Sequence, residues 1–284
     1  MLRLGCVKYL NARPLIHGWV GAVDFDHPAA LCRKLQHGDL DVALVSSLEY
    51  LRRPIYRIVD GVSISAHGAV YSVIVAHNED LSRAEEIEID PASETSVALL
   101  GCLLRQRGLN PRLCVRNTDL QSVRPAELHS AESETTSGPV AQTADRMSAG
   151  RTGQRPMFHL LIGDHAIRFR AEHGERYHYW DLAETWSQIT SLPFVFAFWL
   201  IRPEINKAKE IAHALRQLRD HNLEKLDDLV STQSEVSPAF CRKYYREHLF
   251  FDFGEREKAG LREFHRHCLL NKIDVAPELR LNLV

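Results

Sequence analysis

The chain has 284 residues, more than the roughly 100 to 200 residues of an ordinary domain, and this length predicts two lobes. Hydrophobic residues make up 45% and charged residues 25% of the sequence, which is typical of a globular protein and excludes a disordered chain. The 35 basic and 37 acidic residues nearly cancel, so no overall positive charge favours nucleic-acid binding, and an anionic ligand must be held locally.

The first fifty residues have the pattern of a βαβ unit. Residues 4–10 predict a buried strand that leads into a short helix. A second helix is predicted from Pro28 to Gly38, and residues 41–45 return as a strand. Ser46, followed three residues later by a glutamate, predicts a capping box at the start of a third helix.

The middle of the chain predicts a second set of strands. The apolar run 70–76 has the length and β-branched content of a strand, and we expect it to cross between lobes. Residues 87–89 add a strand, and Ser93 precedes a helix that ends before Gly108. Apolar content then collapses in residues 117–156, which we interpret as a flexible insertion outside the core.

The last part of the chain predicts two more strands and a helical tail. Residues 160–162 form a strand that turns into a helix capped by Asp164. Residues 194–201 are a buried apolar run, and the pattern after Pro203 is helical almost to the end.

The sequence does not predict a metal site, a disulfide or redox site, a membrane segment or a secretory signal. The six cysteines are scattered without a C-x-x-C pair, which favours reduced thiols over a zinc or redox site. No apolar stretch reaches membrane length, and the start lacks the pattern of a secretory signal. We therefore expect a cytoplasmic protein with no metal, no membrane and no nucleic-acid partner.

Three segments share one arrangement, in which a strand ends in a small polar turn that opens a helix. These turns contain Asn11, Ser46 and residues 93–96. In α/β sheets such turns meet at the carboxyl ends of the strands, and the helix amino termini attract anions. The pattern favours a site for a small dianion, although Ser46, Ser93 and Asp164 could each serve only as helix caps and Asn11 only as a turn residue.

Five ordered blocks of the sequence resemble the chorismate dehydratases. They are GCVKYLNARPL at residues 5–15, LDVALVSSLEY at 40–50, SETSVALL at 93–100, LIGD at 161–164 and LPFVFAFW at 192–199. The resemblance implies an α/β, two-lobed fold like the type II periplasmic binding proteins, with crossover strands and a C-terminal helical tail.

The resemblance also implies how the chain divides between the lobes. Residues 1–72 and 200–284 would form the first lobe, and residues 73–199 the second, which would contain the flexible insertion 117–156. The sequence departs from the family pattern in two places. The polar segment 117–156 is longer than its counterpart in the family, and His67 and Ala69 stand where the family has an acidic residue and a proline.

The implied reaction is loss of water from chorismate, which gives 3-[(1-carboxyvinyl)oxy]benzoate without a cofactor. Asn11 would orient the enolpyruvyl carboxylate or the departing hydroxyl, and Asp164 could act as a base, although its charge would be costly beside a dianion. The turns offer poor bases, so a substrate carboxylate could itself take the proton. Substrate-binding side chains would be Ser46, Ser47, Ser65, Ser72, Thr95 and Ser96.

Two other functions fit the same pattern. A non-enzymatic small-anion-binding protein would use the same fold and the same turns. The related 1,4-dihydroxy-6-naphthoate synthase would have similar lobes, but its opening motif differs from the Tyr9-Leu10-Asn11 block of this chain.

Overall fold

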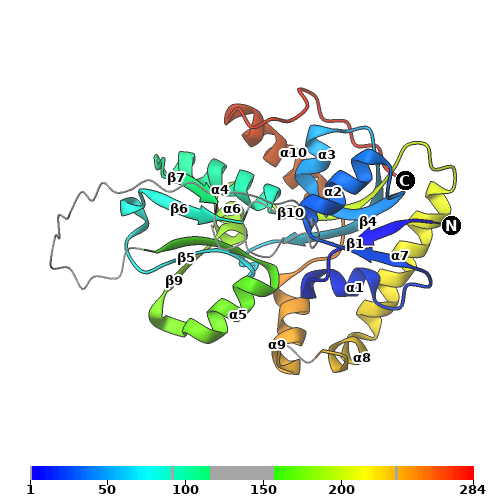
Figure 1. The fold of residues 1–284 in the computed structure, drawn as a ribbon, viewed down its shortest axis with the longest axis horizontal. Coiled ribbons are helices and arrows are strands. Elements are labelled where there is room, and N and C mark those ends of the chain that lie inside the picture. Colours follow the sequence, from blue (N-terminus) through cyan, green and yellow to red (C-terminus); the bar gives the residue numbers. More distant parts are fainter. Residues whose placement is uncertain (1, 91–92, 116–156, 234–235) are drawn as a thin grey trace, which may run out of the picture.

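The computed structural model describes residues 2–90, 93–115, 157–233 and 236–284. Its strands form two separate five-stranded sheets with helices packed around them (Figure 1). The strand order is β2-β1-β3-β10-β4 in the first sheet and β7-β6-β8-β5-β9 in the second. The predicted two-lobed α/β architecture is therefore confirmed.

The first sheet combines parallel and antiparallel strands. Its members are β1 (Leu4–Cys6), β2 (Val23–Phe25), β3 (Val42–Ser46), β4 (Arg57–Ala66) and β10 (Phe194–Ile201). β1 runs parallel to β2 and β3, whereas β10 runs antiparallel to both β3 and β4. The apolar run of β10 is explained by this central position, because helices cover both faces of a strand that has neighbours on both edges.

The second sheet has the same mixed character. Its members are β5 (Val73–His77), β6 (Glu86–Ile89), β7 (Arg112–Val115), β8 (Phe158–Ile162) and β9 (His178–Asp181). β6 runs parallel to β7 and β8, and β5 runs antiparallel to β8 and β9. β2, β4, β7 and β9 are not among the strands that the sequence predicted.

Helices surround the two sheets in chain order. Those before the tail are η1 (Leu10–Ala12), α1 (Arg13–Ile16), α2 (Pro28–His37), α3 (Ser47–Arg52), η2 (Leu81–Arg83), α4 (Glu94–Gln106), α5 (Gly163–His173), η4 (Gly174–Arg176) and α6 (Leu182–Thr190). The tail contains α7 (Ala208–Glu224), α8 (Leu226–Ser231), α9 (Pro238–Lys243), the π-helical turn η5 (Tyr244–His248) and α10 (Glu255–Leu270).

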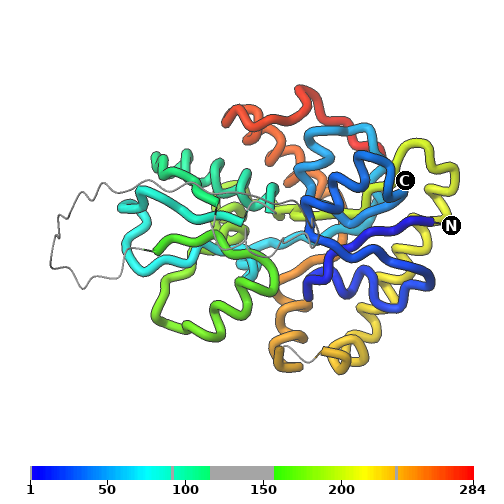
Figure 2. The backbone as a smooth tube through the Cα atoms, viewed as in Figure 1, coloured from blue at the N-terminus to red at the C-terminus, as the bar shows by residue number. Residues whose placement is uncertain are grey.

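The backbone passes between the two sheets at two places (Figure 2). Residues 67–72 connect β4 to β5, and residues 191–193 connect α6 to β10. Since β10 pairs within the first sheet, this pairing favours a lobe boundary near residue 193 over one between 199 and 200. The division of the chain between lobes remains a proposal, with that adjustment.

The helical tail returns to the first sheet. α7 packs against α1 and β4, and α10 packs against β10 and also reaches α4 of the second lobe. The last helix ends at Leu270, and the final residues pair with β4 instead: the Ile58 amide donates to the Asn282 carbonyl, and the Val284 amide donates to the Ile58 carbonyl. The chain end thus extends an edge of β4, and both termini lie in the same half of the molecule (Figure 1).

Two predicted strands are shorter than expected. The strand predicted for residues 4–10 ends at Cys6, because η1 begins at Leu10. The run 70–76 becomes a strand only from Val73, because Tyr71 has a φ of 69°, outside the strand region. The predicted insertion, residues 117–156, lies outside the described residues.

Candidate functional site

A cavity lies between the two sheets, and residues of both line it. It encloses about 680 Å³ of empty space, including its open mouth. Its apolar wall includes Val7, Leu44, Val73, Ile162 and Phe196, and its polar lining is formed by Tyr9, Asn11, Ser46, Ser72, Ser93, Thr95 and Ser96. An apolar cavity with a few convergent polar groups is typical of a small-molecule site.

Four helical segments begin at this cavity. β1 leads to Asn11 in η1, β3 leads to Ser46 before α3, and β8 leads to Gly163 at the start of α5. The fourth, α4, contributes Thr95 and Ser96 from its first turn. The first amides of a helix have no partner within that helix, so those that are not bonded elsewhere in the protein can donate to an anion, and the converging helix starts add partial positive charge.

Thr95 joins the two lobes through its hydroxyl. Its Oγ1 accepts a hydrogen bond from the Leu48 amide at 3.1 Å and donates one to Ser46 Oγ at 2.8 Å. The start of α3 is therefore capped by a side chain from α4 of the other lobe. The predicted capping box of Ser46 and Glu49 is wrong: Ser46 makes no cap hydrogen bond, and the Glu49 carboxylate bonds Gln36 and Tyr56.

Asn11 has a polar atom with no partner. Asn11 is among the residues that line the cavity, and its Oδ1 is buried with no hydrogen-bond partner within the described residues. A buried acceptor without a partner costs about 1–3 kcal/mol, so the arrangement favours a ligand that donates a hydrogen bond there. Among the described residues that were predicted for the site, Asn11 is the one with a fully buried side-chain polar atom that lacks a partner.

Ser72 lies on the segment that joins the two sheets. It is 1% exposed and lines the cavity. Its Oγ accepts a hydrogen bond from the Tyr244 hydroxyl at 2.7 Å, and its carbonyl accepts one from the Gly163 amide at 2.8 Å. Both lobes therefore fix the position of this residue.

Asp164 does not cap its own helix as the sequence predicted. α5 begins at Gly163 with Ile162 as N-cap residue and has no side-chain cap. Instead, Asp164 Oδ1 accepts a hydrogen bond from the Leu10 amide at 2.9 Å, next to Asn11. The carboxylate thus reaches the opposite lobe, and it is not among the side chains that line the cavity.

Ser47 and Ser65 also lie outside the cavity lining, although the sequence hypothesis included both as substrate-binding residues. Ser47 Oγ donates to the Val195 carbonyl at 2.7 Å, and Ser65 Oγ donates to the Phe250 carbonyl at 3.2 Å. Both hydroxyls satisfy main-chain carbonyls. Side chains alternate along a strand and turn away around a helix, so neighbours of a site residue need not face the same cavity.

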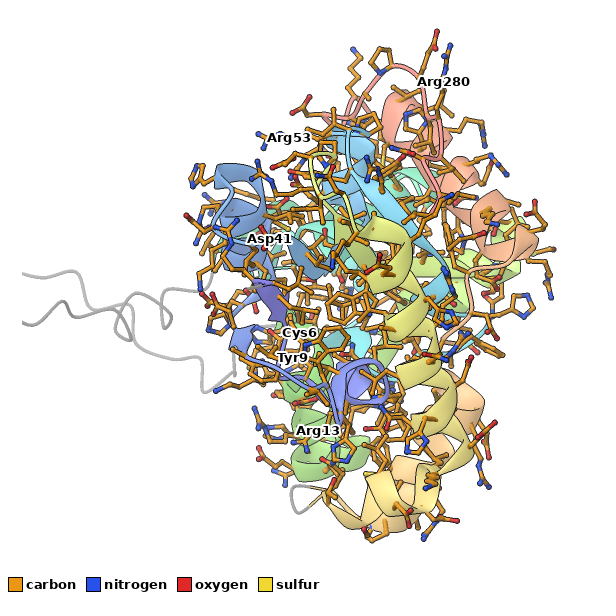
Figure 3. All side chains as sticks on the ribbon, turned by 90° about the vertical axis from the view of Figure 1, so that its right-hand side faces the viewer. Cys6, Tyr9, Arg13, Asp41, Arg53 and Arg280 are labelled. Atoms are coloured by element: carbon orange, nitrogen blue, oxygen red, sulfur yellow. The ribbon has the colours of Figure 1, made fainter. Side chains whose placement is uncertain are left out.

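No lysine, arginine or histidine is among the described residues that line the cavity. Glu94, which does line it, forms an ion pair with Arg52 of α3, so this carboxylate has a cationic partner outside the lining. Burial, with the nearby Asp90 and Asp164, raises the pKa of Tyr9 to about 12, so its hydroxyl stays protonated near neutrality. Figure 3 shows Tyr9 between Cys6 and Arg13, on the path from β1 into α1.

Sequence reasoning missed Gly163 and the paired tyrosines of the tail. Gly163 has a φ of 53°, and a Cβ there would lie 3.3 Å from the Tyr9 ring, so two constraints favour glycine. Tyr244 and Tyr245 bond Ser72 Oγ and the Leu10 carbonyl. Their positions gave no signal beyond the apolar period of a helix.

His67 lies away from the cavity. Its ring contacts Arg256, with 3.1 Å between Nε2 and the guanidinium, and neither His67 nor Ala69 is in the lining. These two departures from the family pattern therefore leave the described cavity wall unchanged. Among the described residues, no group of three or more side chains is arranged to hold a metal ion. In that same part of the chain, no helix is both long and apolar enough to span a bilayer.

The chain was compared with known proteins. A family model described as menaquinone biosynthesis matches residues 2–132 and 127–269. The chorismate dehydratase of Thermus thermophilus is 32% identical over 272 residues, which cover 92% of this chain and 93% of that protein.

Solved structures show the same architecture at low identity. Protein AF1704 of Archaeoglobus fulgidus has a TM-score of 0.67 at 15% identity, over 96% of this chain and 98% of that one. The periplasmic aliphatic sulphonate binding protein SsuA of Escherichia coli has a TM-score of 0.58 at 12% identity, over 99% and 94%. The chain belongs to the menaquinone biosynthesis family and has a fold like that of the periplasmic binding proteins.

Proposed function

We propose that this protein is a chorismate dehydratase, a hydro-lyase that converts chorismate to 3-[(1-carboxyvinyl)oxy]benzoate in the futalosine route to menaquinone. The relative that bears this name matches nearly the whole chain. The observation that carries the proposal is the buried, unpartnered Oδ1 of Asn11 in a cavity without a cationic side chain among its described lining residues. Chorismate brings a hydroxyl to that acceptor and two carboxylates to the helix amino termini.

The reaction needs little from the protein beyond position and charge stabilisation. A proton leaves the ring carbon beside the enolpyruvyl ether, the neighbouring carbon loses its hydroxyl, and the two together form water. The ring becomes aromatic, which supplies the driving force. A site that aligns the C–H and C–O bonds and stabilises the departing oxygen can therefore account for catalysis.

The reaction needs a base that removes the ring proton, and the cavity lining offers no obvious side chain for this role. Asp164 bonds the Leu10 amide and does not line the cavity, and the lining hydroxyls are poor bases near neutrality. We propose that the enolpyruvyl carboxylate of the substrate takes the ring proton. The hydroxyls of Ser46 and Ser96 and the main-chain amides of the first turn of α4, at Thr95 and Ser96, would hold the carboxylates, because the Thr95 hydroxyl proton is already donated to Ser46. Asn11 would orient the departing hydroxyl.

The proposal is tested with purified protein and chorismate. We expect chorismate to disappear and an aromatic product lighter by one water to form, followed by chromatography and mass spectrometry. Calorimetric binding of chorismate without turnover would instead identify a solute-binding protein. Failure to bind or convert chorismate would reject the proposal.

A further inference from the structure

We infer that Tyr244 is a positioning residue that points the Ser72 hydroxyl proton into the cavity, where it serves as the donor to the departing oxygen of the substrate. The inference rests on the proposed function, because that oxygen belongs to the proposed substrate. It adds to that function a residue far along the chain that never touches the ligand.

The direction of the hydrogen bond follows from burial. Tyr244 is 0% exposed, and its hydroxyl contacts Ser72 Oγ at 2.7 Å. No other acceptor for this hydroxyl is recorded in the described ranges, and burial raises the pKa of Tyr244, so the phenol keeps its proton. A buried phenol that did not donate would leave its proton unsatisfied. Tyr244 must therefore donate, and Ser72 must accept.

This assignment decides what Ser72 can offer a ligand. A serine hydroxyl has one proton and two lone pairs. With one lone pair taken by Tyr244, the Ser72 proton is directed away from the phenol, and Ser72 Oγ belongs to a residue that lines the cavity. Ser72 is thereby prepared as a donor, complementary to the unpartnered acceptor of Asn11.

Hydrogen bonds also fix the main chain around Ser72. The Ala69 carbonyl contacts His248 Nδ1 at 2.8 Å, and the Tyr71 amide donates to the Asp181 carboxylate at 2.7 Å. The Ser72 carbonyl accepts from the Gly163 amide at 2.8 Å. With the backbone fixed, rotation of the hydroxyl is the remaining freedom of Ser72, and the contact with Tyr244 restricts it.

The π-helical turn explains how the tail reaches this point. Tyr244 and Tyr245 are consecutive, yet both hydroxyls bond residues at or beside the cavity lining: Tyr244 bonds Ser72, and Tyr245 bonds the Leu10 carbonyl, 2.9 Å away and next to Asn11. Single π-helical turns are frequent at functional sites, where they alter which way side chains point. Tail residues thus support both the turn that contains Asn11 and the connecting segment that contains Ser72.

The test is a double-mutant cycle with chorismate as the substrate. Ser72→Ala should lower kcat by about 100-fold, the scale of losing one oriented donor. Tyr244→Phe leaves Ser72 in place but no longer fixes the direction of its hydroxyl proton. We therefore expect kcat to fall by about tenfold, with KM changed by less than about twofold. Because Tyr244 acts through Ser72, adding Tyr244→Phe to Ser72→Ala should lower kcat no further.

The matched control is Tyr50→Phe. Tyr50 of α3 is also 0% exposed, its hydroxyl donates to the Arg280 carbonyl at 2.7 Å, and it is not among the residues that line the cavity. This variant loses a buried phenol hydroxyl without touching Ser72, so its kcat should equal that of the wild type even if its melting temperature falls.

The possible results distinguish failure of the Tyr244 role from failure of the proposed function. A normal kcat for folded Tyr244→Phe, or effects of the two substitutions that multiply in the double variant, would overturn the positioning role while leaving the dehydratase intact. A wild-type protein that does not convert chorismate would instead overturn the proposed function, and this role with it.

Discussion

Asn11 is the residue on which the proposed chemistry depends most directly. Its Oδ1 is buried without a partner, so the folded protein already bears the cost of desolvating it. Asn11→Ala should lower kcat with chorismate by about 100-fold and should leave stability unchanged or slightly raised. Steady-state kinetics and thermal unfolding measure the two effects.

Two further variants sharpen this prediction. Asn11→Asp nearly preserves the shape but places a negative charge beside a dianion, so KM should rise as well as kcat fall. Asn222→Ala is the control: its Nδ2 donates to the carbonyls of Pro14 and His17, and its loss should lower stability without changing kcat. Near-normal turnover in folded Asn11→Ala would reduce Asn11 to a turn residue.

At the scale of elements, the start of α3 depends on Thr95 of α4. Replacing Thr95 with valine keeps the shape but removes the cap from the Leu48 amide and the donor to Ser46. We expect stability to fall by about 1 kcal/mol and KM for chorismate to rise, because the two lobes lose a contact between cavity-lining residues. Thr95→Ser, which keeps the hydroxyl, should remain close to the wild type.

Thr185→Val provides the comparison for that experiment. Thr185 Oγ1 accepts from Trp180 Nε1 at 2.7 Å and donates to the Asp181 carbonyl, all within the second lobe. It should lose similar stability with KM unchanged. An equal rise in KM for both valine variants would show that general loosening, rather than the contact between lobes, weakens binding.

At the scale of the whole molecule, Asp181 ties the segment between the sheets to the second lobe. Its carboxylate is 6% exposed and accepts from the amides of Val70 and Tyr71 as well as from the first amides of α6. Tyr71 has a φ of 69°, which costs about 1–3 kcal/mol in a non-glycine residue and persists only where surrounding contacts hold it. Asp181→Asn replaces one acceptor oxygen with a donor, so we expect about 1–3 kcal/mol less stability in denaturant unfolding.

Asp80→Asn is the control that separates the loss of a helix cap from the loss of the Asp181 contacts with the connecting segment. Asp80 caps η2 through the Ser82 amide at 2.8 Å and does not reach the connecting segment. Asparagine caps helices about as well as aspartate, so this variant should lose little stability. If the two variants were equally stable, the contacts of Asp181 with Val70 and Tyr71 would be unimportant.

The sequence by itself determined the local pattern of the protein. Strands, polar turns and helix starts follow one another with their own periodicities, and these predicted that Asn11, Ser46, Thr95 and Ser96 lie at helix starts, where the structure has them line a cavity. The chain length predicted two lobes, and the family resemblance implied the two-lobed α/β fold; the periodicities themselves predicted strands alternating with helices, with apolar runs such as that of β10 covered on both faces.

Tertiary structure decided which of the side chains in those polar turns line the cavity and which hydrogen-bond partners they have. Ser47 and Ser65 share the composition of the site but face main-chain carbonyls, and Asp164 bonds the opposite lobe instead of its own helix. Tyr244 reaches Ser72 across 172 positions of sequence. Such contacts depend on how two sheets pack against each other, and local periodicity contains no information about that packing, so only the folded chain shows them.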